Sequence, residues 1–389
     1  MSTMSSKTNC DVIIIGAGSV GIPTAFAIAR AGLSVLVIEQ MASVGQASSK
    51  HAIGGIRATH SDPAKIYLCN RSLDHFSHWQ ERFGDDIEWY KGGYSFVAYR
   101  EGEKQTLLSL LRVQQSMDLN ISWLEREQIL HLVPDLNPEG LLGGTHSPDD
   151  GSASPLKSAY AMYRQAVKSG VMFKFNERIL GVKIEKRQVT DVITNRGTYG
   201  CKILINAAGS WAADFDKDTG ITVPVKPDSH EAGITEPVQR LFDPMIVDIR
   251  PRKGSSNFYF YQQPTGKIIF CITPNPQIWG NLTQDTSEFL PLAARRLIEI
   301  MPKLRNIRVR RTWRGTYPMT PDGSPILGKV EGLDGYLLAV GMCGQGFMLG
   351  PGVAEVLSHL ILDELNQDEQ NTLNALSLYR TFGSVEKLK

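Results

Sequence analysis

The chain of 389 residues lacks the features of disulfide-bonded, metal-binding and nucleic-acid-binding proteins. Its five cysteines are odd in number, far apart and without a CxxC pair, which argues against a disulfide framework, a zinc site and an iron–sulfur cluster. The 41 Lys and Arg residues nearly balance the 40 Asp and Glu residues. Because there is no basic excess, nucleic acid is not an expected partner. The cysteine pattern likewise leaves no expected metal site.

Long hydrophobic runs are missing as well. The apolar run at residues 12–15 is too short for the core of a signal peptide. No window approaches the roughly 18 consecutive apolar residues of a transmembrane helix. We therefore expect a cytoplasmic protein without a transmembrane segment, and the scattered cysteines suit a reducing compartment. At roughly 150 residues per domain, the length predicts two domains, or at most three.

A glycine-rich turn follows the first predicted strand and opens a helix. Gly16 permits the tight turn, Gly18 lets the backbone approach a pyrophosphate, and Gly21 lets the helix and the strand pack closely. The helix N-terminus offers N–H groups and the positive end of a dipole to phosphates. Glu39 ends the second predicted strand, where its carboxylate can accept hydrogen bonds from ribose hydroxyls and disfavours NADP. The pattern predicts a dinucleotide site; an ordinary α/β turn without a ligand is the alternative.

Two later segments favour FAD over NAD. A buried strand at 203–206 runs into the small residues Ala208 and Gly209. Near the C-terminus, a strand at 335–340 leads through Gly344 and Gly346 to a helix expected at 351–364, which Pro351 would open. Because two glycine-led helix N-termini suit a large cofactor contacted at both ends, we expect FAD. An NAD-only dehydrogenase is a distant alternative.

Hydrophobic periodicity gives the other expected elements. Helices are expected at 62–82, 103–118, 155–169 and 288–301. Strands are expected at 94–99, 171–175, 179–184, 188–194, 202–206, 244–249, 257–262 and 267–273.

Several motifs together resemble the amino-acid-oxidase-like FAD family, which includes sarcosine oxidase, glycine oxidase, D-amino acid oxidase and the β subunits of proline dehydrogenase and opine oxidase complexes. Their order along nearly the whole chain makes the resemblance specific. The motifs are VIIIGAGSVGIPTAFAIARAGLSVLVIEQ (12–40), HAIGGIR (51–57), SPDDGSASP (147–155), ILINAAGSWA (203–212), TPDGSPILG (320–328) and VGMCGQGFMLGPGVAE (340–355).

The resemblance implies a fold of the α/β plus α+β class: a Rossmann-like FAD-binding domain with an inserted, mostly antiparallel substrate-binding domain. The FAD-binding domain is expected at 1–85, 147–222 and 319–389, and the substrate-binding domain at 86–146 and 223–318. The implied reaction oxidises a C–N bond next to a carboxylate, passing a hydride to flavin N5 and releasing an imine. The expected partner is a small amino acid, and the sequence names no electron acceptor.

Arg57 matches the arginine that binds the substrate carboxylate in the family. A buried arginine requires an anion or polar partners, and its planar fork fits a carboxylate; a structural salt bridge is the alternative. Met348 stands where monomeric sarcosine oxidase has a lysine, a second carboxylate ligand. This difference argues against sarcosine itself and favours a bulkier or cyclic substrate.

Aromatic residues are expected around the substrate. Tyr317 matches a tyrosine that holds the substrate in sarcosine oxidase, and a half-buried strand tyrosine is the alternative. Tyr259 and Tyr261 alternate with Phe258 and Phe260, so one of the two pairs is expected to wall the pocket, with core packing as the alternative. Further cofactor contacts are expected from Ser48, Ser49, Trp211, Gly315 and Phe347, in addition to Met348.

The covalent and oxygen-activating features of some relatives are not matched. Gly315 replaces the cysteine that bonds FAD in monomeric sarcosine oxidase, so FAD is expected to be noncovalent. A bond to His51 is the alternative, since dimethylglycine dehydrogenase uses a histidine in a similar context. The lysine that activates O2 in the oxidases aligns with Ile268 rather than Lys267, which favours a dehydrogenase. A further hypothesis is that His230 acts as a base.

Two other functions remain open. An O2-using oxidase would differ in the second half-reaction alone. A noncatalytic or partner-dependent FAD subunit is the other, because several relatives of the family work with partner chains; a homo-oligomer is also compatible with the sequence.

Overall fold

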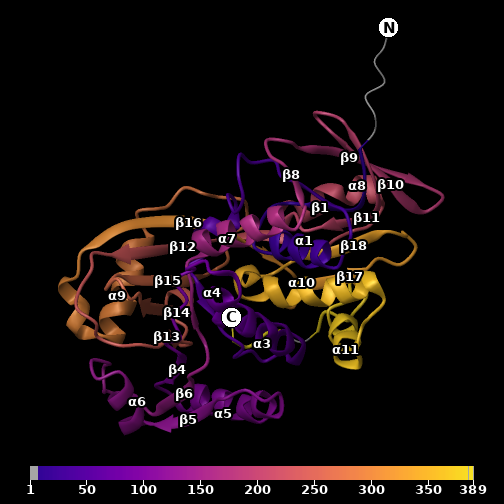
Figure 1. Ribbon diagram of the computed structural model, residues 1–389. Coiled ribbons are helices and arrows are strands. Elements are labelled where there is room, and N and C mark those ends of the chain that lie inside the picture. The colour runs from indigo at the N-terminus through magenta and orange to yellow at the C-terminus, as the bar shows by residue number, and fades with distance from the viewer. Residues whose placement is uncertain (1–7, 384, 389) are drawn as a thin grey trace.

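The computed structural model describes residues 8–383 and 385–388. Residues 1–7, 384 and 389, which fall within the expected domain ranges 1–85 and 319–389, lie outside the described residues. Two eight-stranded sheets dominate the described part, and one small two-stranded sheet joins β3 (Gly55–Ile56) to β7 (Gly151–Ser152). Figure 1 shows one large sheet around β1 and the other around β14.

The first sheet is built on parallel strands. Its path is β17-β18-β11-β1-β2-β8, with β10 and β9 continuing from β11. β1 pairs in parallel with both β2 and β11, so its run of buried apolar residues lies at the centre of the sheet, as the sequence predicts. The strands are β1 (Thr8–Ile15), β2 (Val35–Ile38), β8 (Met172–Lys174), β9 (Ile179–Glu185), β10 (Gln188–Thr194), β11 (Thr198–Asn206), β17 (Ile326–Lys329) and β18 (Tyr336–Val340).

The second sheet is mostly antiparallel and follows the order β16-β12-β15-β14-β13-β4-β6-β5. β13 and β4 form a parallel pair within it. One face packs on helix α9 (Phe289–Ile300), around the buried Phe258, Phe260 and Phe270. The strands are β4 (Tyr94–Ala98), β5 (Ser122–Glu125), β6 (Gly143–Ser147), β12 (Lys226–Thr235), β13 (Met245–Asp248), β14 (Gly254–Gln262), β15 (Ile268–Asn275) and β16 (Val309–Met319).

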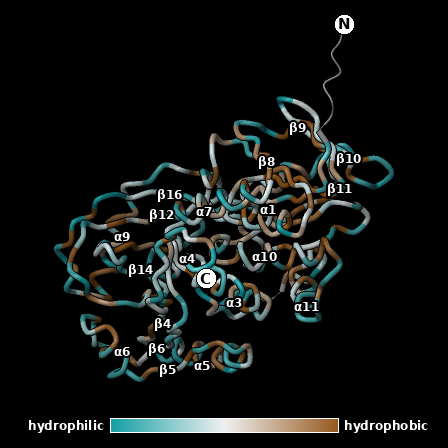
Figure 2. The backbone as a smooth tube through the Cα atoms, in the orientation of Figure 1, coloured by the Kyte–Doolittle hydropathy of each residue, from teal (hydrophilic) through white to brown (hydrophobic). Residues whose placement is uncertain are grey.

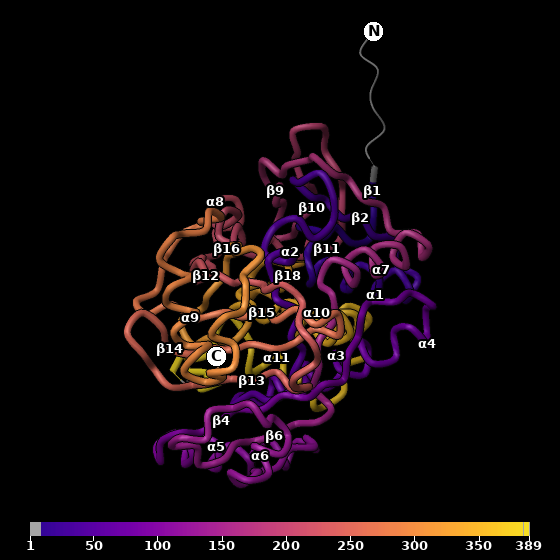
Figure 3. The backbone as a smooth tube through the Cα atoms, turned by 90° about the vertical axis from the view of Figure 1, so that its left-hand side faces the viewer, coloured from indigo at the N-terminus to yellow at the C-terminus, as the bar shows by residue number. Residues whose placement is uncertain are grey.

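Helices cover the first sheet, and the segments with the strongest hydrophobicity gather around β1, α1 and α10 (Figure 2). Helices α5 and α6 lie instead at the far end of the molecule from β1 and β2 (Figure 3). The remaining helices are α1 (Gly21–Arg30), α2 (Ser48–His51), α3 (Pro63–Ser77), α4 (Trp79–Phe83), α5 (Glu101–Ser116), α6 (Arg126–Leu132), α7 (Pro155–Lys168), α8 (Asp216–Thr219), α10 (Gly346–Leu362) and α11 (Gln367–Ala375), with 3-10 turns at Gly209–Phe215 and Pro302–Asn306. No helix of residues 8–383 and 385–388 combines the length and apolar character needed to cross a membrane.

Two helix predictions need correction. The helix expected at 62–82 is two helices, α3 and α4, separated at His78. The helix expected from Pro351 begins earlier, at Gly346, and Pro351 lies inside α10. The sequence rule placed proline in the first turn, where its missing N–H costs nothing. Here the stretch from Gly346 to Gly350 is helical instead, and Gly350 packs so closely on the backbone of Ser19 that a Cβ would overlap its carbonyl oxygen.

Candidate functional site

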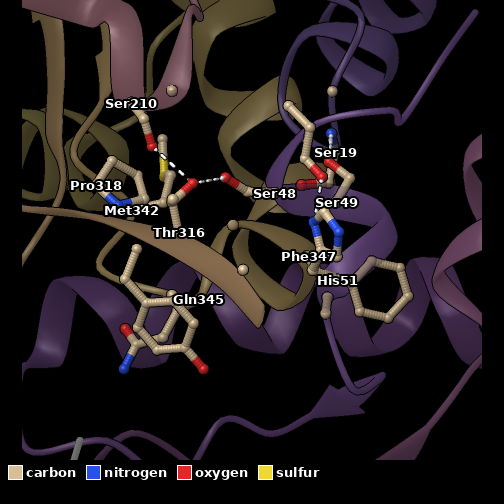
Figure 4. Close-up of a pocket in the computed structure, with 18 of the residues that line it drawn as sticks. Ser19, Ser48, Ser49, His51, Ser210, Thr316, Pro318, Met342, Gln345 and Phe347 are labelled. Atoms are coloured by element: carbon tan, nitrogen blue, oxygen red, sulfur yellow. Dashed lines mark hydrogen bonds between the residues drawn. The ribbon is translucent and has the colours of Figure 1, made fainter. Parts of the chain in front are cut away.

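A cavity of about 700 Å³ lies between the two large sheets. Residues of the glycine-rich turn line one part of it, and strands β12, β13, β14 and β16 of the second sheet line another. Figure 4 shows the part of this cavity around α2, β16 and the start of α10. The predicted site residues that line it are Gly16, Gly18, Glu39, Ser48, Ser49, His51, Arg57, Ala208, Gly209, Trp211, Tyr259, Gly315, Tyr317, Gly344, Gly346, Phe347 and Met348.

The glycine-rich turn requires its glycines for backbone packing. Gly16 has a φ of +99°, and a Cβ there would lie 2.8 Å from the carbonyl oxygen of Ala207. A Cβ on Gly21 would overlap the carbonyl oxygen of Gly16. Gly21 is the one predicted site residue that does not line the cavity. Its place supports the packing role that the sequence predicts, because it brings α1 against the turn.

Glu39 organises the same turn from the end of β2. Its Oε2 accepts a hydrogen bond from the Ala17 backbone N–H at 2.7 Å, and its Oε1 accepts one from the Met41 N–H at 2.7 Å. Each carboxylate oxygen keeps a further lone pair, and Glu39 lines the cavity. The carboxylate is therefore held rigidly at the cavity wall.

Helix α10 begins at the cavity. Gly344, Gly346 and Met348 line it, and no side chain caps the N-terminus, so free backbone N–H groups and the positive end of the dipole lie at this wall. A Cβ on Gly344 would overlap the ring of Tyr317. The glycine therefore allows that tyrosine to pack flat against the loop before α10.

Helix α2 and strand β16 meet at another part of the cavity wall. A Cβ on Gly315 would lie 2.5 Å from the Cβ of His51, so the two residues are in close contact. His51 also places its Nδ1 3.0 Å from the Ala47 carbonyl oxygen, and burial lowers the pKa of its imidazole. Thr316 links Ser48 and Ser210, with oxygen–oxygen distances of 2.9 and 3.0 Å (Figure 4).

Arg57 is buried, with 5% of its surface exposed, and follows β3. Its Nη1 donates to the Thr59 carbonyl oxygen and lies 3.2 Å from Nδ1 of His60. Its Nη2 donates to the carbonyl oxygen of Leu388. The guanidinium lies over the ring of Phe96, with its carbon 5.3 Å from the ring centre. Main-chain carbonyls and an aromatic face thus fix the guanidinium plane at the cavity wall.

A cluster of rings and polar groups forms the substrate-side wall. The hydroxyls of Tyr259 and Tyr317 are 2.9 Å apart, and burial raises the pKa of both phenols. The imidazole of His230 stacks on the Tyr317 ring at 3.8 Å and 20°. His230 Nε2 lies 3.2 Å from Oδ2 of Asp228. Although burial opposes ionisation of Asp228, the hydrogen bond from His230 lowers the pKa of that carboxyl.

The structure also places the other residues that the sequence analysis considered for the cavity. Tyr259 lines the cavity, whereas Phe258 and Phe260 pack under α9. Tyr261 does not line the cavity: it is buried in an apolar cluster, and its hydroxyl donates to the Ile53 carbonyl oxygen. Lys267 precedes β15, is half-buried and does not line the cavity. Ile268 is fully buried in the core on the α9 side, so neither residue brings an ammonium group to the cavity.

The sequence analysis missed several residues of this wall. Asp228 and Cys271 line the cavity and were not identified. The signal for Asp228 was weak because β12 has a polar sequence with a proline and two acidic residues, which is typical of a loop. Cys271 lies on β15, a strand that the sequence predicts, but nothing in its sequence context marks it as a cavity residue. Burial raises the pKa of the Cys271 thiol to about 12, so the side chain is a neutral packing group.

A separate polar cluster lies away from the cavity, between α3, α10 and α11. Ligand atoms of Glu355, His359 and Glu369 lie within 4.8 Å of one another. The guanidinium of Arg71 lies 3.3 Å from Glu355 and 3.7 Å from Glu369. The arginine already balances these carboxylates, and the cluster acts as an ion-pair network between helices.

Known proteins resemble the chain over most of its length. The family model for FAD dependent oxidoreductase (DAO) matches residues 11–360. L-proline dehydrogenase from P. horikoshii superposes with a TM-score of 0.89 at 28% identity, covering 96% of this chain and 98% of that one. Hydrogen cyanide synthase subunit HcnC of Pseudomonas aeruginosa is 28% identical over 73% of this chain and 66% of its own length. Mitochondrial sarcosine dehydrogenase of Mus musculus is 22% identical over 91% of this chain and 40% of its own length.

The chain thus spans less than two thirds of the length of these two curated relatives. The match to the family model nevertheless runs from within β1 to near the end of α10 and covers all or most of every strand of both large sheets. The Rossmann-like fold that the sequence predicts is confirmed. The chain belongs to the family of FAD-dependent oxidoreductases, as its glycine-rich turn and motif order predict.

Proposed function

We propose that the protein uses FAD to oxidise the C–N bond of an N-substituted or cyclic amino acid, of the sarcosine, proline or opine kind. The observation that carries this proposal is the shared cavity, in which the glycine-rich turn and α10 face Arg57, Tyr259 and Tyr317. The relatives named above act on proline and sarcosine, according to their names. The product would be an imine that hydrolyses in water.

The cavity residues fit FAD. The N–H groups at the start of α1 suit a pyrophosphate, and the turn has no room for a Cβ at Gly16 or Gly21. Glu39 would bind the ribose hydroxyls. Bound FAD supplies the acceptor for a hydride from the carbon next to the substrate nitrogen. The N-terminus of α10 would stabilise negative charge that develops at this wall.

The substrate would be held between Arg57 and the aromatic wall. A guanidinium whose plane is already fixed binds a carboxylate with little loss of side-chain entropy. The raised pKa values of Tyr259 and Tyr317 keep both hydroxyls protonated near neutral pH, so they would orient the amine by hydrogen bonds. Met348 presents an apolar surface in the same cavity, which favours a cyclic or bulkier substrate.

We also propose that the two large sheets mark two domains. The β1 sheet, with segments 1–85, 147–222 and 319–389, would bind FAD. The β12 sheet, with segments 86–146 and 223–318, would hold the substrate. The supporting observation is that the cavity lies between these sheets.

FAD is proposed to be noncovalent, because Gly315 offers no nucleophile at the wall beside His51. A covalent bond to His51 is the alternative. Acid precipitation of the purified protein tests this: flavin in the supernatant supports the proposal, whereas flavin in the pellet that His51→Ala releases supports the bond.

The function is tested by anaerobic titration of the flavin-loaded protein with L-proline, sarcosine, opines and D-amino acids. Loss of the visible flavin absorption with one compound is the expected result and names the substrate class. Hydrogen peroxide formation after re-aeration would favour an oxidase over a dehydrogenase. The absence of a lysine from the position of Ile268 favours a dehydrogenase.

A partner-dependent FAD subunit is a second candidate function. Helix α7 exposes apolar side chains at helical spacing: Leu156, Tyr160 and Val167 have 56, 58 and 46% of their surfaces exposed. The relative HcnC is itself named as a subunit. A flavin spectrum that no compound of the panel changes would favour this function.

A further inference from the structure

The segment 385–388 folds back onto the region that carries Arg57. The Glu386 backbone N–H donates to the Asp322 carbonyl oxygen at 3.0 Å, and the Lys387 N–H donates to Ser61 Oγ at 2.9 Å. Glu386 and Leu388 are buried, with 4 and 0% of their surfaces exposed. The segment is therefore integrated in the core.

Glu386 anchors the segment through a buried charge. Its Oε2 lies 2.9 Å from Nζ of Lys65, and neither side chain has exposed surface. Its Oε1 accepts hydrogen bonds from the Ser61 N–H at 2.9 Å and from Ser61 Oγ at 2.7 Å. Because removing one member of a buried ion pair leaves the other charge uncompensated, this anchor is expected to hold strongly.

Leu388 connects the anchor to the cavity wall. Its side chain packs in one apolar cluster with Tyr94, Phe96 and Met245, all of which line the cavity, although Leu388 itself does not. Its carbonyl oxygen accepts the hydrogen bond from Nη2 of Arg57. The other terminal nitrogen, Nη1, donates to Thr59, which lies on the same stretch of chain as Arg57. Leu388 is thus the distant partner that fixes the guanidinium.

We propose that residues 385–388 position Arg57 for the carboxylate of the substrate, with Glu386 as the anchor and the Leu388 carbonyl as the contact. This inference rests on the proposed role of Arg57. Since Leu388 stands behind the cavity wall, loosening the segment leaves the cofactor contacts in place and alters the direction of the guanidinium. The effect is therefore selective for ligands that carry a carboxylate.

The test uses flavin-loaded wild type, Glu386→Gln and Leu388→Ala, with Val385→Ala as the matched control, because Val385 is 55% exposed in the same segment. Binding of benzoate and of uncharged benzamide is followed by the change in the flavin spectrum. Stopped-flow reduction by the substrate gives its apparent Kd and the limiting rate. Flavin content and Tm are measured for each variant.

The expected result is an affinity for benzoate and for the substrate about tenfold weaker in both segment variants, since one charge-assisted hydrogen bond is misdirected. The limiting rate, benzamide binding and flavin content stay within about twofold, and Val385→Ala matches wild type. Equal losses for benzoate and benzamide, or unchanged benzoate binding in both variants, would overturn the proposal. Leu388→Ala keeps the ion pair, so it remains informative should Glu386→Gln not fold.

Arg57→Lys separates this proposal from the proposed function. Weak benzoate binding in Arg57→Lys, together with wild-type flavin that no amino acid reduces, would contradict the proposed function and leave the positioning of Arg57 supported. Benzoate binding that is insensitive to Arg57→Lys, or absent from wild type, overturns the positioning role itself.

Discussion

The two walls of the cavity are formed by different parts of the chain, one mainly by backbone groups and the other mainly by side chains. On the β1 side, backbone groups form the wall: a turn with no room for a Cβ at Gly16 or Gly21, and the N-termini of α1 and α10. On the β12 side, side chains form the wall, with Tyr259, Tyr317 and His230 in contact with one another. The first wall suits a ligand that is the same throughout a family, and the second suits a ligand that differs among its members.

The two walls are also expected to differ in how well they tolerate substitutions. At Gly16 and Gly21, an added Cβ would meet a backbone carbonyl oxygen that cannot easily move away. A side-chain wall can lose one group and keep its neighbours. The following substitutions test this difference, from the largest expected effect to the smallest.

Gly21→Ala is expected to be the most damaging change. Its Cβ overlaps the Gly16 carbonyl oxygen, so α1 must move away from the turn. We expect a loss of about 3 kcal/mol of stability and of most of the bound flavin. Thermal unfolding and the flavin-to-protein absorbance ratio measure both. Gly102→Ala in α5 is the control: with no atom within 4 Å of its Cβ, it should be neutral or slightly stabilising.

Arg57→Ala is expected to weaken binding of an amino-acid substrate by roughly 2–3 kcal/mol, about 30- to 150-fold, because the carboxylate loses its charged partner. Flavin content should stay at the wild-type level. Anaerobic flavin reduction at increasing substrate concentration measures the change. An unchanged apparent affinity would show that Arg57 is a structural residue.

Tyr317→Phe is expected to have a smaller effect. The variant keeps the ring between His230 and Gly344 but removes the hydroxyl that pairs with Tyr259. We expect a loss of about 1 kcal/mol, or roughly fivefold in apparent affinity, with flavin binding intact. Tyr259→Phe should give a similar loss of apparent affinity. The loss in the double variant should be smaller than the sum of the two single losses. Additive losses would mean that the two hydroxyls act independently.

Titration of Glu386 in its ion pair with Lys65 is expected to change stability least near neutral pH. Although burial opposes ionisation, Lys65 and His60 hold the pKa of Glu386 well below its ordinary value of 4.5. Because the folded-state pKa is lowered, the stabilisation is complete above pH 4.5 and is lost as the pH falls below it. Tm values between pH 7 and pH 3 measure the slope that appears below pH 4.5, and Glu386→Gln should flatten it. An equal slope in the variant would assign acid sensitivity to other groups.

The same comparison explains what sequence reasoning could predict. The β1 wall could be predicted because a continuous apolar run followed by closely spaced glycines is typical of few structures other than a buried strand and a tight turn. The predicted start of α10 was wrong because proline commonly occupies the first turn of a helix, whereas Pro351 lies inside α10. No local sequence signal reveals that Gly350 contacts Ser19.

The β12 wall was predicted in part. Tyr259 and Tyr317 were found by strand alternation and by resemblance, but β12 itself was not. Its buried Asp228 and His230 pair through Oδ2 and Nε2 across two residues, a contact that forms only once the strand is folded. The contact of Leu388 with Arg57 joins residues so far apart in sequence that no local pattern could indicate it.

The close packing of Gly350 on Ser19 has a consequence for how the protein is made. A ribosome completes the glycine-rich turn and β2 early, yet β1 gains its second parallel partner only when β11 emerges, and α1 contacts α10 later still. Such distant contacts slow folding, and the nascent chain exposes its apolar strand meanwhile. The glycine-rich turn is therefore encoded first, but it reaches its final packing against α10 only after Gly350 has been synthesised.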